Sequence, residues 1–248
     1  MNEVRFDYHG AAVLVTGGTS GIGHAIAVAF AAAGASVTVT GTRAAATEYD
    51  TDLSGFSFRQ TEMTDPASIE GLIASLDSLD VLVNNAGANF PGGRDEWEPD
   101  TFATALELNL GGPMRLTTGC RDLLRASGLE GGASVINIAS MSSFRAVPIV
   151  PGYSSAKAGL VALTKNLARQ WVADHIRVNA VAPGVIETRM TAPLEVLPEL
   201  RDVELAHIPM GHFGTPADVA SAVLFLASSG AAYITGTTFA VDGGYLTI

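Results

Sequence analysis

The chain has few of the residues that would tie it to a disulfide framework, a metal ion or a nucleic acid. Its single cysteine, Cys120, cannot form an internal disulfide. The five histidines are scattered and form no cluster with metal-ligand spacing, so we expect no metal site. Lysine and arginine total 14 against 25 acidic residues, which gives a formal charge of −11. A nucleic-acid partner is not expected, because such proteins need a basic surface.

Long apolar runs are also missing. No segment reaches the ~18 uninterrupted apolar residues of a membrane-spanning helix. The first ten residues, "MNEVRFDYHG", contain no basic region followed by an apolar run, so no secretory signal is expected. Together with the lack of disulfides, these absences favour a cytoplasmic location without a membrane partner. The acidic stretch "RDEWEPD" (94–100) is interpreted as a solvated face.

What the chain does contain is a regular alternation of short apolar runs and longer helical patterns. These Val- and Ile-rich runs are apolar on both faces, which is typical of a parallel sheet covered by helices on both sides. We therefore predict one α/β domain over 1–248, a Rossmann fold with a doubly wound, seven-stranded parallel sheet. Strands are expected at 11–17, 35–41, 56–60, 80–87, 133–140, 176–184 and 237–244, and helices at 21–34, 65–76, about 100–127, 153–173 and 215–228.

A glycine-rich turn joins the first predicted strand to the first predicted helix. In "TGGTSGIG" (16–23), Gly17, Gly21 and Gly23 permit a tight turn and a close approach of the backbone to a pyrophosphate. The following helix directs its free N–H groups at the anion, and Thr19 and Ser20 add hydroxyl donors. The turn, including Ile22, is a candidate dinucleotide-binding loop.

Lysine is scarce: the chain has only Lys157 and Lys165. Lys157 follows Tyr153 by four residues in a helical pattern, so the two side chains share one helix face. A phenol with a pKa near ~10 is a poor acid or base at pH 7, but a neighbouring ammonium favours the phenolate. Tyr153 is thus a candidate general acid for carbonyl reduction and a base for the reverse reaction.

Six motifs occur in one order along the chain: "TGGTSGIG", "NNAG" (84–87), "NLGG" (109–112), "NIAS" (137–140), "YSSAKAG" (153–159) and "APGVIET" (182–188). Together they resemble the short-chain dehydrogenase/reductase family, and the chain looks similar to its 3-oxoacyl-[acyl-carrier-protein] reductase-like members. The match runs from about Ala11 to Gly244.

This resemblance implies a catalytic set of four residues. Tyr153 would be the proton donor, and Lys157 would also bind the nicotinamide ribose. Asn109 resembles the relay asparagine of the family, which holds a water beneath the lysine. Ser140 ends the fifth predicted strand, where substrates of open parallel sheets bind, and its hydroxyl can hold the substrate oxygen.

The resemblance also implies cofactor contacts outside the glycine-rich turn. Residues Asn85, Ala86 and Gly87 would line the adenosine ribose, and Ile186 and Thr188 would contact the nicotinamide carboxamide. Glu62 stands where the family usually has an aspartate that contacts adenine, which leaves that contact open, while Met63 keeps a backbone contact.

The residues after the second predicted strand bear on the choice of cofactor. An acidic residue there accepts the adenine ribose hydroxyl and repels a 2′-phosphate. Here Gly41 takes that place, and Thr42 and Arg43 can donate to a phosphate. Ser20 stands where many NADP-using members carry a second basic residue. NADP(H) is favoured over NAD(H).

Segment 187–216 resembles the substrate lid of the family. Its apolar residues Met190, Leu194, Leu197 and Met210 favour a substrate with an apolar portion. Segments 88–93 and 143–152 would form the other walls of the substrate pocket. Candidate substrates are a 3-oxoacyl thioester, a cyclic ketone, a steroid and a sugar-like alcohol. The family resemblance further implies a homotetramer.

The main hypothesis is an NADP(H)-dependent oxidoreductase acting on a carbonyl compound or secondary alcohol. The nearest alternative is an NAD-dependent secondary alcohol dehydrogenase. Dehydratase or epimerase chemistry on the same fold, or a non-catalytic dinucleotide-binding sensor or scaffold, are further alternatives.

Overall fold

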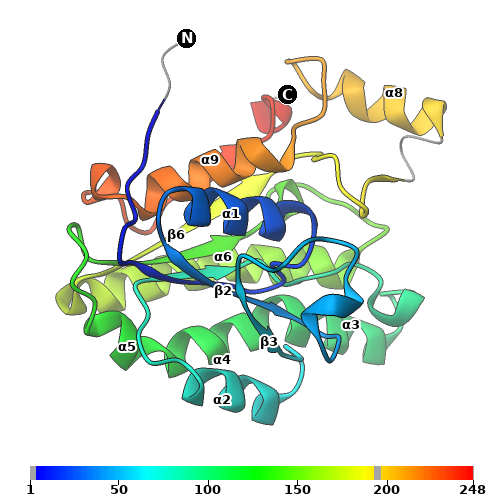
Figure 1. Cartoon of the computed structure of the whole chain (residues 1–248). Coiled ribbons are helices and arrows are strands. Elements are labelled where there is room, and N and C mark those ends of the chain that lie inside the picture. Colours follow the sequence, from blue (N-terminus) through cyan, green and yellow to red (C-terminus); the bar gives the residue numbers. More distant parts are fainter. Residues whose placement is uncertain (1–3, 193–196, 248) are drawn as a thin grey trace.

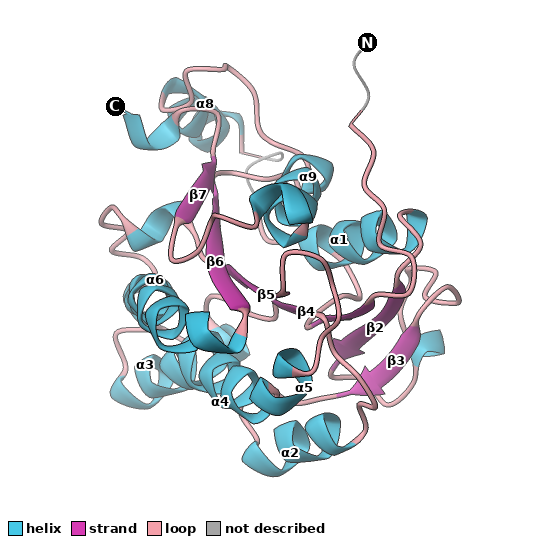
Figure 2. Cartoon of the chain, turned by 90° about the vertical axis from the view of Figure 1, so that its left-hand side faces the viewer, coloured by secondary structure: helices cyan, strands magenta, loops and turns pink. Residues whose placement is uncertain are grey.

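A computed structural model describes residues 4–192 and 197–247. Its centre is a seven-stranded parallel sheet with the strand order β3-β2-β1-β4-β5-β6-β7, which confirms the predicted doubly wound α/β architecture (Figures 1 and 2). The strands are β1 (Ala12–Val15), β2 (Ser36–Gly41), β3 (Ser57–Gln60), β4 (Val81–Asn84), β5 (Ala133–Ile138), β6 (Ile176–Pro183) and β7 (Thr238–Val241).

Helices cover both faces of the sheet. Figure 1 shows α1 (Gly21–Ala32) and α9 (Pro216–Ala227) above the strands, packed against each other. The other face is covered by helices that lie below the strands in the same view. These are α2 (Pro66–Ala74), α3 (Pro99–Leu106), α4 (Gly112–Gly119), α5 (Arg121–Arg125) and α6 (Pro151–Trp171).

The alternation of side chains along the strands divides the core into two layers. Val13 and Val15 of β1 pack in one cluster with Phe30 of α1, whereas Leu14 packs in the opposite cluster with Leu116 of α4. Successive residues of a strand point to opposite faces, so an uninterrupted apolar run serves both layers. This arrangement explains why the central strands read as continuous apolar sequence.

The predicted helix over about 100–127 is a set of shorter helices. A π-helical turn, η3 (Glu107–Gly111), separates α3 from α4, and α5 follows after a break at Cys120. The irregular segment expected over 187–216 also contains a helix, α8 (Pro198–Ala206). The sequence analysis missed both features because it placed helices by apolar periodicity, and α8 has no buried residue.

Several single turns of 3-10 helix lie in the loops. They are η1 (Ala46–Glu48), η2 (Pro91–Gly93), η4 (Met141–Ser143), η5 (Val172–Asp174), η6 (Ser229–Ala231) and η7 (Tyr245–Thr247). Within residues 4–192 and 197–247, no helix is long and apolar enough to cross a membrane. In the same part of the chain, no group of three or more His, Cys, Asp or Glu side chains could hold a metal ion.

Arg177 joins β6 to the end of α9. The side chain is only 6% exposed, and its guanidinium donates to the carbonyl oxygens of Leu226 (2.6 Å) and Ala227 (3.0 Å). It also donates to the carbonyl of Gly131, in the loop before β5 (3.0 Å). A cation at a helix C-terminus satisfies carbonyls that have no partner within the helix, so Arg177 fixes α9 on the sheet.

We expect the substitution Arg177→Met to lower the free energy of unfolding by about 3 kcal/mol, because buried carbonyls lose a charged donor. Chemical denaturation measures this change. Arg169→Met is the matched control, since Arg169 is exposed near the end of α6 and should tolerate the change. Equal denaturation midpoints for the wild type and Arg177→Met would contradict this role.

Candidate active site

A large cavity of about 1120 Å³ opens at the carboxyl ends of the strands. Its walls come from the loops after β1 to β6, the edge where open parallel sheets bind ligands. Of the residues predicted from the sequence to form the site, only Arg43 and Asn109 do not line it. Those that do are Gly17, Thr19, Ser20, Gly21, Ile22, Gly23, Thr42, Glu62, Met63, Asn85, Ala86, Gly87, Ser140, Tyr153, Lys157, Ile186 and Thr188.

The glycine-rich turn has the backbone shape that an anion site needs. Gly17 (φ +63°) and Gly21 (φ +53°) lie in the left-handed region that side chains disfavour. A Cβ on Gly23 would collide with the carbonyl of Gly17, so glycine lets α1 begin directly against the turn. Ser20, the N-cap of α1, makes no side-chain cap, and no acidic residue occupies the first turn. The N-terminus of α1 is therefore free of a competing internal anion.

Asn85 supports this turn. Its amide nitrogen donates to the carbonyls of Thr16 (2.9 Å) and Gly17 (3.2 Å), while the Thr16 hydroxyl accepts from the backbone N–H groups of Asn85 and Ala86 (both 3.0 Å). Asn85, which was predicted to line the adenosine ribose, thus uses its amide N–H groups to bind the loop after β4 to the loop after β1.

Tyr153 and Lys157 lie on one face of α6, as their spacing predicts. The ammonium of Lys157 lies 5.5 Å from the centroid of the Tyr153 ring and donates to the carbonyl of Ile138 (2.8 Å). Lys157 is only 3% exposed. The carbonyl of Ile138 is the last of β5, so this bond fixes α6 at the carboxyl end of that strand.

Ser140 follows β5 by two residues. Its Oγ accepts a hydrogen bond from the backbone N–H of Ser142 (3.2 Å). This contact uses a lone pair of the hydroxyl, so its hydrogen can be donated to the phenol oxygen of Tyr153, with which Ser140 forms a hydrogen bond, or to another oxygen in the cavity.

Asn109 lies in the π-helical turn rather than in a regular helix. Its amide nitrogen donates to the carbonyls of Ala88 (2.9 Å) and Ala105 (3.0 Å), and its Oδ1 is buried without a partner. A Cβ built on Gly87 would lie 2.5 Å from this oxygen and 3.2 Å from the Lys157 ammonium. Gly87 therefore leaves a space between an unpartnered acceptor and a buried cation, which fits the relay role that the family resemblance implies.

The environment of Tyr153 differs from the expectation drawn from the sequence. Burial raises the pKa of the phenol above its usual value, a hydrogen bond with Ser140 lowers it, and the charge of Glu96 raises it. Lys157 was expected to lower the pKa, but burial is the largest influence, so the pKa of the phenol is raised although the ammonium lies 5.5 Å from the ring centroid. Burial also lowers the pKa of Lys157 from 10.5 to about 8.

The residues after β2 leave no room for an acidic side chain. A Cβ on Gly41 would collide with the hydroxyl of Tyr49, a cavity residue that the sequence analysis missed because no motif marks it. Arg43 lies just outside the cavity, with its guanidinium 4.9 Å from the centre of the Tyr49 ring. It also donates to the carbonyl of Glu48, and its backbone N–H donates to the Tyr49 hydroxyl (2.8 Å).

Glu62 uses its carboxylate locally. Its Oε1 accepts from the backbone N–H (3.3 Å) and the hydroxyl (3.1 Å) of Thr64. Met63, next to it, is 3% exposed and lines the cavity. One oxygen of the Glu62 carboxylate is thus bonded within its own turn, while Glu62 also lines the cavity.

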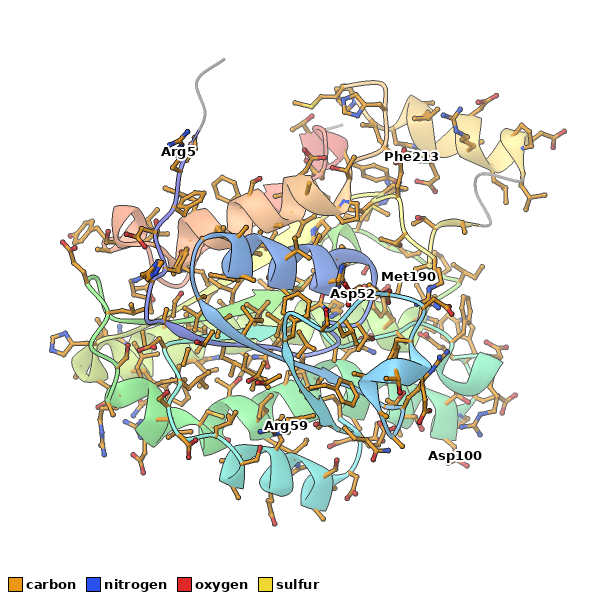
Figure 3. All side chains as sticks on the ribbon, viewed as in Figure 1. Arg5, Asp52, Arg59, Asp100, Met190 and Phe213 are labelled. Atoms are coloured by element: carbon orange, nitrogen blue, oxygen red, sulfur yellow. The ribbon has the colours of Figure 1, made fainter. Side chains whose placement is uncertain are left out.

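The predicted lid contributes only part of its length to the cavity. Met190 lines it and lies on the loop that leads from β6 toward α8 (Figure 3). Glu204 of α8 also lines it and accepts a hydrogen bond from the hydroxyl of Tyr245 (2.8 Å). Leu197 and Met210 are exposed and do not line the cavity, and Leu194 lies outside the described residues.

The buried Lys157 ammonium should lower the free energy of unfolding of the protein at neutral pH. Below pH 8 the folded protein holds a charge that burial disfavours, whereas the unfolded chain carries it freely up to its own pKa of 10.5. We expect Lys157→Met to raise the free energy of unfolding at pH 7 by an amount on the order of 3 kcal/mol, and with it the unfolding temperature. This gain in stability should fade as pH rises from about 8 to 10.5.

Thermal unfolding followed across this pH range checks that expectation. Lys165→Met is the control, because it removes the only other lysine from an exposed position on the same helix. A Lys157→Met protein that is less stable than the wild type at pH 7 would show that the ammonium stabilises the fold.

Comparison with known proteins places this geometry in a family. Residues 17–246 match the family model described as Enoyl-(Acyl carrier protein) reductase. Over 241 residues the chain is 36% identical to the 3-oxoacyl-[acyl-carrier-protein] reductase FabG of Vibrio cholerae, covering 95% of this chain and 97% of the relative. It is also 36% identical to the 2-(R)-hydroxypropyl-CoM dehydrogenase of Xanthobacter autotrophicus over 248 residues, covering 95% and 98%.

Solved structures agree with the sequence relatives. The complex of Pseudomonas aeruginosa RhlG with NADP superposes with a TM-score of 0.86 at 30% identity, covering 98% of this chain and 99% of that one. The fold is therefore shared along nearly the whole chain. The chain belongs to the short-chain dehydrogenase/reductase family of NAD(P)-dependent oxidoreductases.

Proposed function

We propose that the protein transfers hydride between NADP(H) and a carbonyl compound or secondary alcohol with an apolar portion, such as a 3-oxoacyl compound or another ketone. One observation carries the proposal: Ser140, Tyr153 and Lys157 line the same cavity as the glycine-rich turn at the N-terminus of α1. A dinucleotide bound at that turn can extend along the cavity to the catalytic side chains.

The roles of the side chains follow from their contacts. The bound dinucleotide would supply the hydride. Ser140 is held by the N–H of Ser142 and directs its own hydrogen at the substrate oxygen. Tyr153 donates a proton to the alkoxide that develops during reduction and accepts it in the reverse direction. Lys157 is anchored on Ile138 and places a cation beside the phenol, and Asn109 offers a buried acceptor next to that cation.

Three observations support NADP(H) over NAD(H). The Tyr49 hydroxyl fills the space that a carboxylate at position 41 would need, so nothing there repels a 2′-phosphate. Thr42 lines the cavity, and Arg43 lies beside its rim. The relative RhlG was solved with NADP. An NAD-dependent alcohol dehydrogenase is the second candidate, because the Arg43 guanidinium is already bonded to Glu48.

The walls of the cavity support a substrate with an apolar portion. The cavity is lined by the apolar residues Phe90, Met141, Val147, Ile149 and Met190. We infer that segment 187–216 acts as a lid over this region of the single domain 1–248. Names of the relatives include a reductase of 3-oxoacyl groups and a dehydrogenase of a hydroxypropyl thioether, so the substrate is open within this class. A homotetramer and a cytoplasmic location stay predictions.

We expect Tyr153→Phe to lose nearly all turnover, by about 10²- to 10⁴-fold, because the phenolic proton is gone, while NADPH still binds. Turnover is read as the loss of absorbance of the reduced cofactor across a panel of ketones, and binding as cofactor fluorescence. Tyr233→Phe is the control, since Tyr233 is fully exposed. Undiminished turnover in Tyr153→Phe would refute the assigned acid.

Arg43→Ala should raise KM for NADPH by about tenfold and leave KM for NADH unchanged, because only NADPH carries the phosphate that the guanidinium would bind. Steady-state kinetics with both nicotinamides measure the effect. Arg59→Ala is the control, since Arg59 is an exposed arginine of the neighbouring strand β3 (Figure 3). Equal changes in KM for NADPH and NADH would instead support the NAD-dependent candidate.

A further inference from the structure

Glu96 is a completely buried carboxylate in a stretch that the sequence analysis interpreted as a solvated face. That interpretation is correct for its exposed neighbours but wrong for Glu96, which is 0% exposed. Its two oxygens accept hydrogen bonds from two different backbone N–H groups. Oε1 binds the N–H of Phe90 (2.7 Å), and Oε2 binds the N–H of Tyr153 (2.8 Å), 57 residues along the chain.

The bond to Tyr153 lies in the first turn of α6. N–H groups in a first turn have no partner within the helix, and a negative charge is favoured there. Gly152 permits the carboxylate to come close: a Cβ at that position would lie 3.3 Å from Oε2 of Glu96 and 2.9 Å from Cβ of Ala105. Glu96 therefore supplies, from a distant segment, the acceptor that a local cap usually supplies.

The bond to Phe90 lies in the wall of the cavity. Phe90 lines the cavity and adopts a left-handed backbone conformation (φ +45°), which a bulky residue disfavours. Strained conformations of this kind persist only where the surroundings hold them. The next residue, Trp97, binds a second segment of the cavity wall, because its indole N–H donates to the carbonyl of Pro148 (2.9 Å), which lies between the cavity residues Val147 and Ile149.

We propose that Glu96 is a positioning residue for the proposed reaction: its carboxylate holds the backbone of Tyr153 and the wall residue Phe90 in one fixed arrangement. The segment around Glu96 then sets the distance between the proton donor and the substrate that rests on Phe90. Glu96 does not line the cavity, so it acts through Tyr153 and Phe90 and touches neither substrate nor cofactor. This inference rests on the proposed function.

The charge of Glu96 has a second consequence. It raises the pKa of Tyr153, in the same direction as burial and against Ser140. Lys157 lies over the phenol ring, and the charged residues Glu62, Arg189 and Glu204 line the same cavity. A neutral side chain at position 96 leaves these groups in place and removes one charge, so the pKa of Tyr153 should fall.

The test compares Glu96→Gln, Glu96→Asp and Glu98→Gln in the full chain. Glutamine keeps the shape but removes the charge and turns an N–H₂ group toward one of the two backbone donors. Aspartate keeps the charge on a shorter side chain. Glu98→Gln makes the same chemical change at an exposed position two residues away. Circular dichroism checks that each variant is folded. If Glu96→Gln does not fold, the comparison of Glu96→Asp with the wild type still tests the proposal.

In reduction, Tyr153 must carry its proton, so the rate falls as pH rises through its pKa. We expect this falling limb of kcat to move to lower pH in Glu96→Gln, with kcat reduced about tenfold and NADPH affinity unchanged. Glu96→Asp should keep the limb near the wild-type position, and Glu98→Gln should match the wild type throughout. A limb in the wild-type position in Glu96→Gln, or one displaced equally in Glu96→Asp, would overturn the proposal.

A second readout does not depend on turnover. In protein labelled with 13C at the tyrosine Cζ, the signal of Tyr153 is the one absent from Tyr153→Phe. Its chemical shift and its titration should both change in Glu96→Gln and not in Glu98→Gln. Identical spectra and titrations for wild type and Glu96→Gln would overturn the positioning role. Full turnover by Tyr153→Phe would instead refute the proposed function, so the two failures are told apart.

Discussion

The site depends on one costly interaction, the burial of the Lys157 ammonium at the carboxyl end of β5. Burial disfavours the charge and lowers the pKa of Lys157 to about 8, and a carbonyl of β5 provides its hydrogen-bond acceptor. A buried cation persists only where fixed acceptors surround it. Here the carbonyl of Ile138 at the end of β5 is such an acceptor, and Gly87 in the loop after β4 leaves a space between the ammonium and the Asn109 oxygen.

The surrounding polar contacts serve to hold loops rather than to stabilise the core. Asn85 joins the loops after β1 and β4, and Asn109 joins the π-helical turn to the loop after β4. Glu96 joins that same loop to the first turn of α6. Each of these side chains binds backbone groups from separate segments, so the loops around the cavity are linked to one another. Such a linked arrangement keeps donors and acceptors in place before a substrate arrives.

Much of the architecture was predictable because its signals are local. Apolar runs at regular intervals specify a parallel sheet, and the Gly-rich turn must follow β1 for steric reasons. The spacing of Tyr153 and Lys157 alone places both on one helix face. The π-helical turn, α8, Tyr49 and Glu96 were not predictable in this way. Glu96 occurs among exposed acidic residues, and neither its spacing nor its type distinguishes it from them.

The amino-acid sequence by itself determined the parallel sheet and the identity of the groups at its carboxyl edge, since periodicity, glycine positions and four-residue spacing act over short stretches of chain. Tertiary structure alone decided the electrostatics. Burial, not Lys157, dominates the pKa of Tyr153, and a carboxylate 57 residues away holds its backbone. Desolvation and hydrogen bonding of this kind depend on which distant segments meet, and that is settled only when the chain packs.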